Sequence, residues 1–160
     1  MNAKLGFLFL TLCGALAAQS SHGYFFAAPG GVTSGGYTDK SWHVGGGGEG
    51  ILGKGIGVGA ELGALGPTDC FSCVIGSFSA NGSYHFLRGR EHKVDPFVTT
   101  GYTLLFRGET RSLVNFGVGV NYWFSKPVGV KVEFRDHVYP VGTPEHYWGF
   151  RFGVTFRIPS

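Results

Sequence analysis

The sequence predicts an all-β protein, an eight-stranded antiparallel up-and-down transmembrane β-barrel. After residue 18 the apolar side chains recur at every second position, as in a strand whose successive side chains lie on opposite faces. The alternating segments run for about ten residues, close to the 9–11 tilted residues that cross a membrane and longer than the five or six usual in soluble proteins. Charged residues make up 14% of the chain, well below the roughly 25% of an ordinary soluble domain.

Residues 1–18 are predicted to be a secretory signal peptide. Lys4 supplies the positive start, residues 5–16 are almost entirely apolar, and residues 15–17 read ALA, a small-x-small cleavage site. The apolar stretch is shorter than the roughly 20 residues of a membrane-spanning helix. We therefore expect residues 19–160 to form the exported barrel domain.

Eight segments of the exported part carry the alternation. In the last one, large apolar side chains alternate with small or charged ones, so Phe150, Phe152 and Val154 oppose Arg151 and Gly153. The first two segments are rich in Gly, and their alternation is the weakest. The expected strands are 24–32, 42–52, 56–65, 73–86, 96–106, 113–124, 128–135 and 147–158.

The size of the two faces predicts which one points outward. Eight strands enclose little more than room for side chains, so the small Gly, Ser and Asn face fits inside and the bulky apolar face meets lipid. A secreted soluble barrel that binds a small apolar ligand would reverse this arrangement. That soluble barrel is the main alternative, but its outer face would carry more Lys and Glu than these segments contain.

An N-terminus on the periplasmic side predicts where aromatic side chains and connections lie. The outward aromatic residues should then form two belts, as membrane barrels show. We expect periplasmic turns at 53–55, 88–95 and 125–127, and outer loops at 33–41, 66–72, 107–112 and 136–146. The expected periplasmic belt is Tyr24, Phe26, Tyr84, Phe86, Tyr122, Phe124 and Phe156, and the expected outer belt is Trp42, Phe106 and Trp148.

The C-terminal residues 151–158, RFGVTFRI, carry the most specific family feature. The chain resembles the small eight-stranded outer-membrane barrels, similar to the transmembrane domain of outer-membrane protein A. That resemblance implies location in the cell outer membrane and an assembly signal at Arg151, Gly153, Phe156 and Ile158, read by the outer-membrane assembly machinery. The tail Pro159-Ser160 departs from the family, which often stops on an aromatic residue.

Charged side chains on the inward faces predict a network in the lumen. Buried charges must be paired, because an isolated one costs several kcal/mol. We expect a structural ion-pair network, with a small channel gated by exchange of partners as the alternative. The candidate residues are Glu49, Glu61, Lys131, Glu133, Arg135 and Arg151.

Cys70 and Cys73 lie in the second outer loop as Cys-Phe-Ser-Cys. Two cysteines close together in an exported chain favour a local disulfide. A zinc site would need further ligands, and Asp69 is the one adjacent candidate. We therefore expect no metal and no cofactor.

The function expected from these features is a structural, surface-interaction or minor porin-like role without catalysis. Expected partners are outer-membrane lipid and lipopolysaccharide, because Arg107, Arg111 and Lys40 can bind their phosphates. No nucleic-acid partner is expected, and the protein should be a monomer. A lipid-modifying enzyme at the outer rim is a second alternative. Its candidate residues would be His137 and His146, beside Asp136 and Glu145, with Ser112 as the hydroxyl group.

Overall fold

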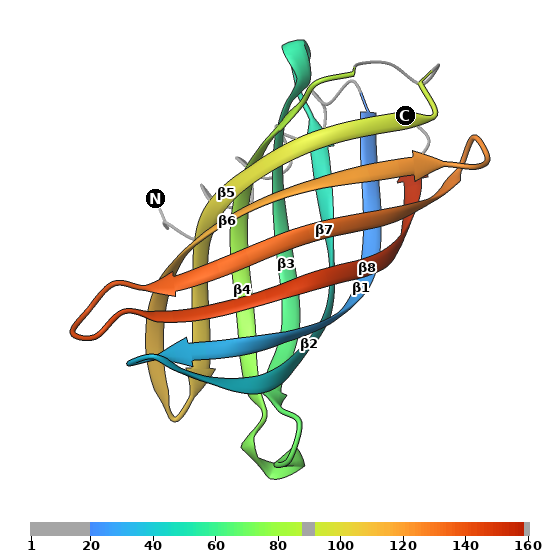
Figure 1. Ribbon diagram of the computed structural model, residues 1–160. Coiled ribbons are helices and arrows are strands. Elements are labelled where there is room, and N and C mark those ends of the chain that lie inside the picture. The colour runs from blue at the N-terminus through green and yellow to red at the C-terminus, as the bar shows by residue number, and fades with distance from the viewer. Residues whose placement is uncertain (1–19, 88–91, 159–160) are drawn as a thin grey trace, which may run out of the picture.

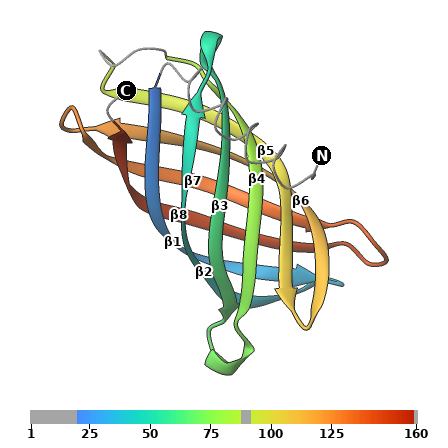
Figure 2. The ribbon, with the colours of Figure 1, turned by 180° about the vertical axis from the view of Figure 1, so that it is seen from behind.

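In the computed structural model, which describes residues 20–87 and 92–158, eight antiparallel strands close into a barrel (Figure 1). Each strand pairs with its neighbours in sequence, and β1 pairs with β8 to close the ring (Figure 2). The predicted fold class is therefore confirmed. The strands are β1 (Ser20–Ser34), β2 (Tyr37–Ile51), β3 (Ile56–Pro67), β4 (Ile75–His85), β5 (Val94–Arg107), β6 (Glu109–Trp123), β7 (Val128–Tyr139) and β8 (Glu145–Ile158).

The part of the chain that the structure describes holds two short 3-10 turns, η1 (Gly53–Gly55) and η2 (Phe71–Cys73). No helix in that part is long and apolar enough to span a membrane. The predicted signal peptide at 1–18 lies outside the described residues and stays a prediction.

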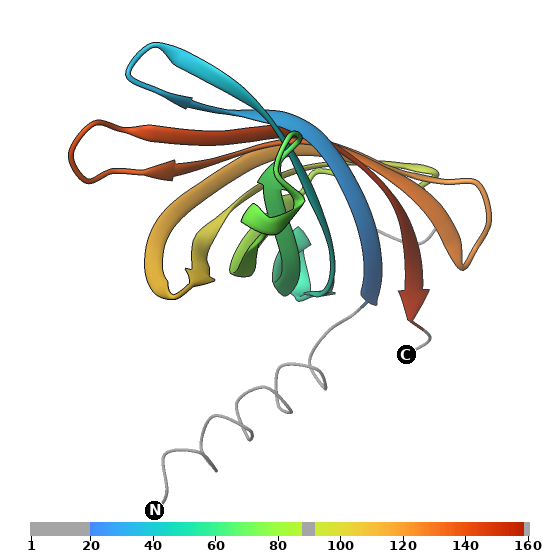
Figure 3. The ribbon, with the colours of Figure 1, turned by 90° about the horizontal axis from the view of Figure 1, so that it is seen from below.

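The two ends of the barrel differ in their connections. The terminal end is the one where β1 begins and β8 ends, and the distal end is the opposite one. At the distal end the β1–β2 and β7–β8 hairpins extend to the same side (Figure 3), and the β3–β4 connection extends below the barrel in Figure 1. The four distal connections are residues 35–36, 68–74, 108 and 140–144.

Most of the distal loops are shorter than the sequence predicts. The strands run past the apolar segments into polar residues, where alternation gives no contrast between the faces. Gly35 and Gly36 turn between β1 and β2 with φ of 57° and 86°. A two-residue hairpin turn with positive φ at both positions suits Gly because it lacks a Cβ.

The exterior is apolar over the middle of the strands and polar at their distal ends, and most of the small side chains of β3 to β8 lie inside, as predicted. At the distal end Trp42, Phe106 and Trp148 occupy outward positions, as predicted. The exposed aromatic residues near the terminal end are Tyr84, Phe86, Tyr122, Phe124 and Phe156, together with Phe25.

The prediction for β1 is wrong at two positions. Tyr24 and Phe26 are 5% and 6% exposed and point into the lumen, whereas Phe25 between them is 69% exposed. Three consecutive aromatic residues offer no alternation in polarity, so the sequence could not decide which face points inward. The lumen favours the two inward rings because cations lie over both of them, as described below.

Candidate functional site

The lumen is the candidate functional site, because buried polar side chains from all eight strands meet there. A polar interior under an apolar exterior is the reverse of a soluble barrel. Each inward position is set by strand alternation, so the site follows from the barrel itself. The buried polar residues include His22, His43, Glu61, Ser77, Ser79, His85, Asp95, Thr99, Thr103, Asn115, Asn121, Lys131, Glu133, Arg135, His137, Arg151 and Thr155.

Glu61 is the centre of the larger charged cluster. Its carboxylate accepts hydrogen bonds from Arg151 Nη1 on β8 at 2.8 Å and from the Tyr24 hydroxyl on β1 at 2.9 Å. Arg135 Nη1 on β7 lies 3.7 Å from Glu61 Oε2, the oxygen that also accepts from Tyr24. One carboxylate on β3 therefore contacts side chains from β1, β7 and β8.

Glu133 extends this cluster along β7. It pairs with Arg135, two residues further along the same face, and its Oε2 lies 3.5 Å from Lys131 Nζ. The Lys131 ammonium also lies 4.2 Å and 4.3 Å from the ring centroids of Tyr24 and Phe97. The central cluster, Glu61, Glu133, Lys131, Arg135 and Arg151, thus contains five of the six charges that the sequence places in the lumen.

Glu49, the sixth predicted charge, lies in a separate terminal cluster. Its oxygens are 3.2 Å from His22 Nε2 and 3.4 Å from His85 Nε2, and Ser83 donates a hydrogen bond to it. His85 Nδ1 lies 2.8 Å from Asp95 Oδ2. Glu49 is therefore held by two imidazoles rather than by the Lys and Arg partners that the sequence suggested.

The sequence missed most of the terminal cluster, which we define as Glu49, His22, His85 and Asp95. Alternation places His85 inward, but His22 precedes the first expected strand and Asp95 falls in an expected turn. Asn121 Nδ2 donates to Asp95 Oδ2 at 3.2 Å. If the first and fifth strands had been predicted with their observed bounds, alternation would have placed residues 22 and 95 inward and revealed the cluster.

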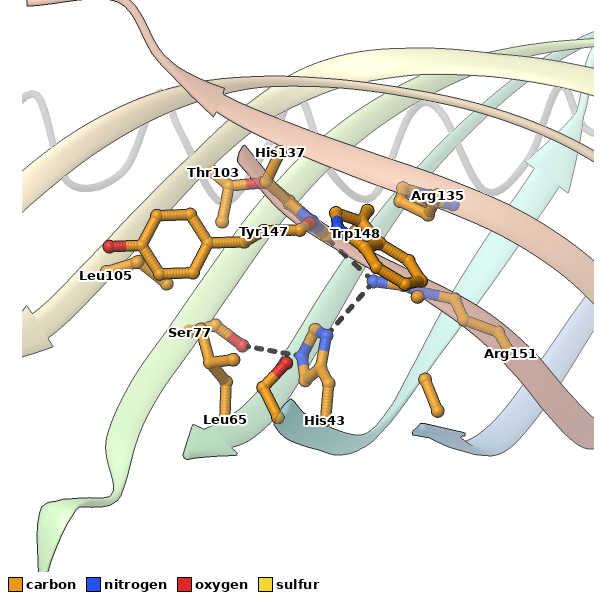
Figure 4. A pocket seen from close by; sticks show the side chains of 13 residues that line it. His43, Leu65, Ser77, Thr103, Leu105, Arg135, His137, Tyr147, Trp148 and Arg151 are labelled. Atoms are coloured by element: carbon orange, nitrogen blue, oxygen red, sulfur yellow. Dashed lines mark hydrogen bonds between the residues drawn. The ribbon is translucent and has the colours of Figure 1, made fainter. Parts of the chain in front are cut away.

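Towards the distal end the lumen holds a small cavity between His43, His137 and Arg151 (Figure 4). Arg151 Nη2 lies 3.4 Å from His43 Nδ1 and 3.5 Å from His137 Nε2, and His43 Nε2 lies 3.1 Å from Ser77 Oγ. The space left has room for about one water molecule.

An apolar layer lies beyond this cavity. Leu65, Leu105 and Leu113 pack together inside the distal end, with Ile75 and Tyr147 against them. From the distal mouth inward, the side chains that fill the lumen thus become more polar. Rings and paired charges occupy its middle, and the arrangement is that of a packed core.

The residues considered for a rim enzyme do not assemble into one site. His146 Nδ1 lies 2.8 Å from Asp136 Oδ2 on the outer face, whereas His137 points into the lumen. Ser112 lies on β6, and β7 separates it from His146 on β8. In the described residues no group of three or more His, Cys, Asp or Glu side chains is arranged to hold a metal ion.

Cys70 and Cys73 form a disulfide in the β3–β4 connection. The sequence expectation of a local disulfide therefore agrees with the structure. Nearby, Arg107 Nη2 donates to the Ser72 carbonyl at 2.7 Å, and Arg111 Nη1 lies 3.3 Å from Glu145 Oε2. Both arginines thus already have protein partners.

The predicted assembly-signal residues lie on β8 with mixed orientation. Phe156 and Ile158 point outward and are exposed, while Arg151 is buried in the central cluster. Gly153 lies where β1 and β8 approach closely, beside Phe26. Recognition of these residues by the assembly machinery stays a prediction.

Comparisons with known proteins agree with the fold. No protein-family model and no curated protein matches the chain. Among solved structures, the N-terminal β-barrel domain of Pseudomonas aeruginosa OprF matches with a TM-score of 0.66 and 16% identity, over 88% of this chain and 98% of that one.

Two further solved structures match in the same way. Neisserial surface protein A gives a TM-score of 0.69 at 14% identity, over 86% of this chain and 97% of that one. Ail, the attachment invasion locus protein of Yersinia pestis, gives 0.56 at 12% identity, over 88% and 99% of the two chains. The chain therefore has the fold of the small eight-stranded transmembrane barrels.

Proposed function

We propose that this protein is an outer-membrane β-barrel with a structural or surface-interaction role and no catalytic activity. The observation that carries the proposal is the distribution of side chains: large apolar residues cover the outside, and ion-paired charges fill the inside. The hydrocarbon core of a membrane requires a closed sheet and an apolar surface, and this chain has both. In the proposed orientation the terminal end faces the periplasm and the distal end faces the outside.

A role at the cell surface is supported by the proteins of the same fold. One is described as a surface protein, and Ail was crystallised with the heparin analogue sucrose octasulfate. For this chain we propose lipid and lipopolysaccharide as partners. Lys40 and Arg111 are both exposed at the distal end, and Arg111 would meet a phosphate in exchange for Glu145.

We propose that the chain is exported by the predicted signal peptide, is inserted with the help of its C-terminal strand, and works as a monomer. Phe156 and Ile158 support the insertion step because they remain accessible on the outer face of β8. Arg151 would be recognised before folding, since it is buried once the barrel has closed.

The proposal is tested by gel mobility of the membrane fraction, boiled against unboiled. A closed membrane barrel resists unfolding in cold detergent, so we expect a heat-dependent shift in protein extracted from the outer membrane. A single band in the soluble periplasmic fraction would contradict the proposal. Transfer and hydrolysis assays on lipid A and phospholipid should show no activity, and any activity lost with His146→Ala would contradict the non-enzymatic role.

A further inference from the structure

The β3–β4 connection at the distal end, residues 68–74, is restrained at its tip in two ways. The Cys70–Cys73 disulfide closes its tip, and the Cys73 amide donates to the Cys70 carbonyl at 3.1 Å. Arg107 fixes the same tip from β5 through the Ser72 carbonyl. A covalent bond and an anchor from a separate strand thus restrain the conformations open to the loop.

The residue presented by this restrained tip is Phe71, which is 81% exposed. Its ring centroid lies 6.3 Å from that of Trp42, tilted by 34°. Trp42 belongs to the outward aromatic positions of the distal end, and its Nε1 donates to the carbonyl of Pro67, the last residue of β3 before this connection. Phe71 therefore extends the aromatic exterior of the barrel.

We propose that the disulfide-closed loop is a lipid-contacting surface, with Phe71 inserted into the interface of the outer leaflet. The inference rests on the proposed membrane location. Phe71 is contiguous with Trp42 of the outer aromatic belt. When lipid covers its apolar ring, the surface of the ring is removed from water, which is favourable. The restraints hold the ring in place beforehand, so little conformational freedom is lost on contact.

Tyr37 provides a matched comparison within the same chain. It is 83% exposed, almost the same as Phe71, but it lies at the tip of the projecting β1–β2 hairpin. Trp42 lies five residues further along β2, which corresponds to about 17 Å at 3.3 Å per residue. Lipid should therefore cover Phe71 and leave Tyr37 in water.

Hydroxyl-radical footprinting of the unmodified protein in lipid nanodiscs tests this inference. The labelling rate of each residue is divided by its rate in the unfolded chain, which removes the difference in reactivity between Phe and Tyr. We expect Phe71 to be labelled several-fold more slowly than Tyr37 and about as slowly as Phe152 in the middle of the outer face. Equal normalised rates at Phe71 and Tyr37, with Phe152 protected, would contradict this inference but leave the proposed membrane location intact.

The controls separate this inference from the proposed function. Rapid labelling of Phe152 would show that lipid does not cover the barrel, which contradicts the membrane location itself. In a Cys70→Ser, Cys73→Ser double variant, we expect the Phe71 rate to rise towards that of Tyr37 while Phe152 stays protected. An unchanged, low Phe71 rate in that variant would overturn the role assigned to the disulfide.

Discussion

The two charged clusters of the lumen are built from different cations. In the central cluster Glu61 is held by Arg135 and Arg151, whereas in the terminal cluster Glu49 is held by His22 and His85. A guanidinium group stays charged and only donates hydrogen bonds, while an imidazole ring can both donate and accept. The terminal cluster can therefore adapt to the loss of a carboxylate, and the central cluster cannot.

This difference gives the same substitution two different costs. Both carboxylates are buried, with side-chain exposures of 2% for Glu61 and 8% for Glu49. Burial is thus nearly matched, and the nature of the partner becomes the variable. Removing the two carboxylates in turn measures how much a guanidinium partner, as opposed to an imidazole, contributes to a barrel core.

Reversal of the central charge should have the largest effect. Glu61→Lys would place a fourth cation beside Arg135, Arg151 and Lys131, and their repulsion should separate the side chains that block the lumen. We expect no steady current through the wild-type protein in planar bilayers and a measurable current through Glu61→Lys.

Glu49→Lys is the matched control for that experiment. The nearest partners of Glu49 are imidazole rings rather than guanidinium groups, so a lysine there meets fewer fixed positive charges, and we expect a smaller current or none. If Glu61→Lys behaves like the wild type, partner exchange at Glu61 does not open the lumen, and the minor porin-like role loses its support.

Removal of the central charge without reversal should have the next largest effect. Glu61→Gln leaves Arg135 with Glu133 as its remaining carboxylate partner and leaves Arg151 without one among the carboxylates described. Breaking a buried ion pair from one side costs about 3–5 kcal/mol. We expect the free energy of unfolding from lipid vesicles, measured by denaturant titration, to fall by that amount.

The pattern of apolar residues was sufficient to predict the barrel and the inward faces of β3 to β8, because large and small side chains alternate through most of these strands, least cleanly in β5. It failed at Tyr24 and Phe26, where neighbouring residues are equally aromatic. Their orientation depends on Lys131 and Arg151, which arrive from strands more than 100 residues away in sequence.

The sequence predicted which charged side chains lie in the lumen, but not which of them pair with each other. Alternation placed Glu49 inward, but whether it meets an arginine or a histidine depends on the register and tilt of the strands, which set the height of each side chain. The same limitation applies to the loops. Polar strand ends such as Thr38 to Lys40 give no alternation in hydropathy, so the observed pairing of β1 with β2 extends further than the sequence indicates.

The smallest effect is expected for Glu49→Gln. After this substitution His85 keeps Asp95 as a partner at 2.8 Å, and the new amide oxygen can accept from an imidazole N–H. What remains is the loss of a charge-assisted hydrogen bond, worth about 1.5 kcal/mol. The same denaturant titration, run beside Glu61→Gln, should show this smaller fall in the free energy of unfolding. Equal losses for the two variants would mean that the histidines do not adapt, and that the two clusters, despite their different cations, respond to a missing carboxylate in the same way.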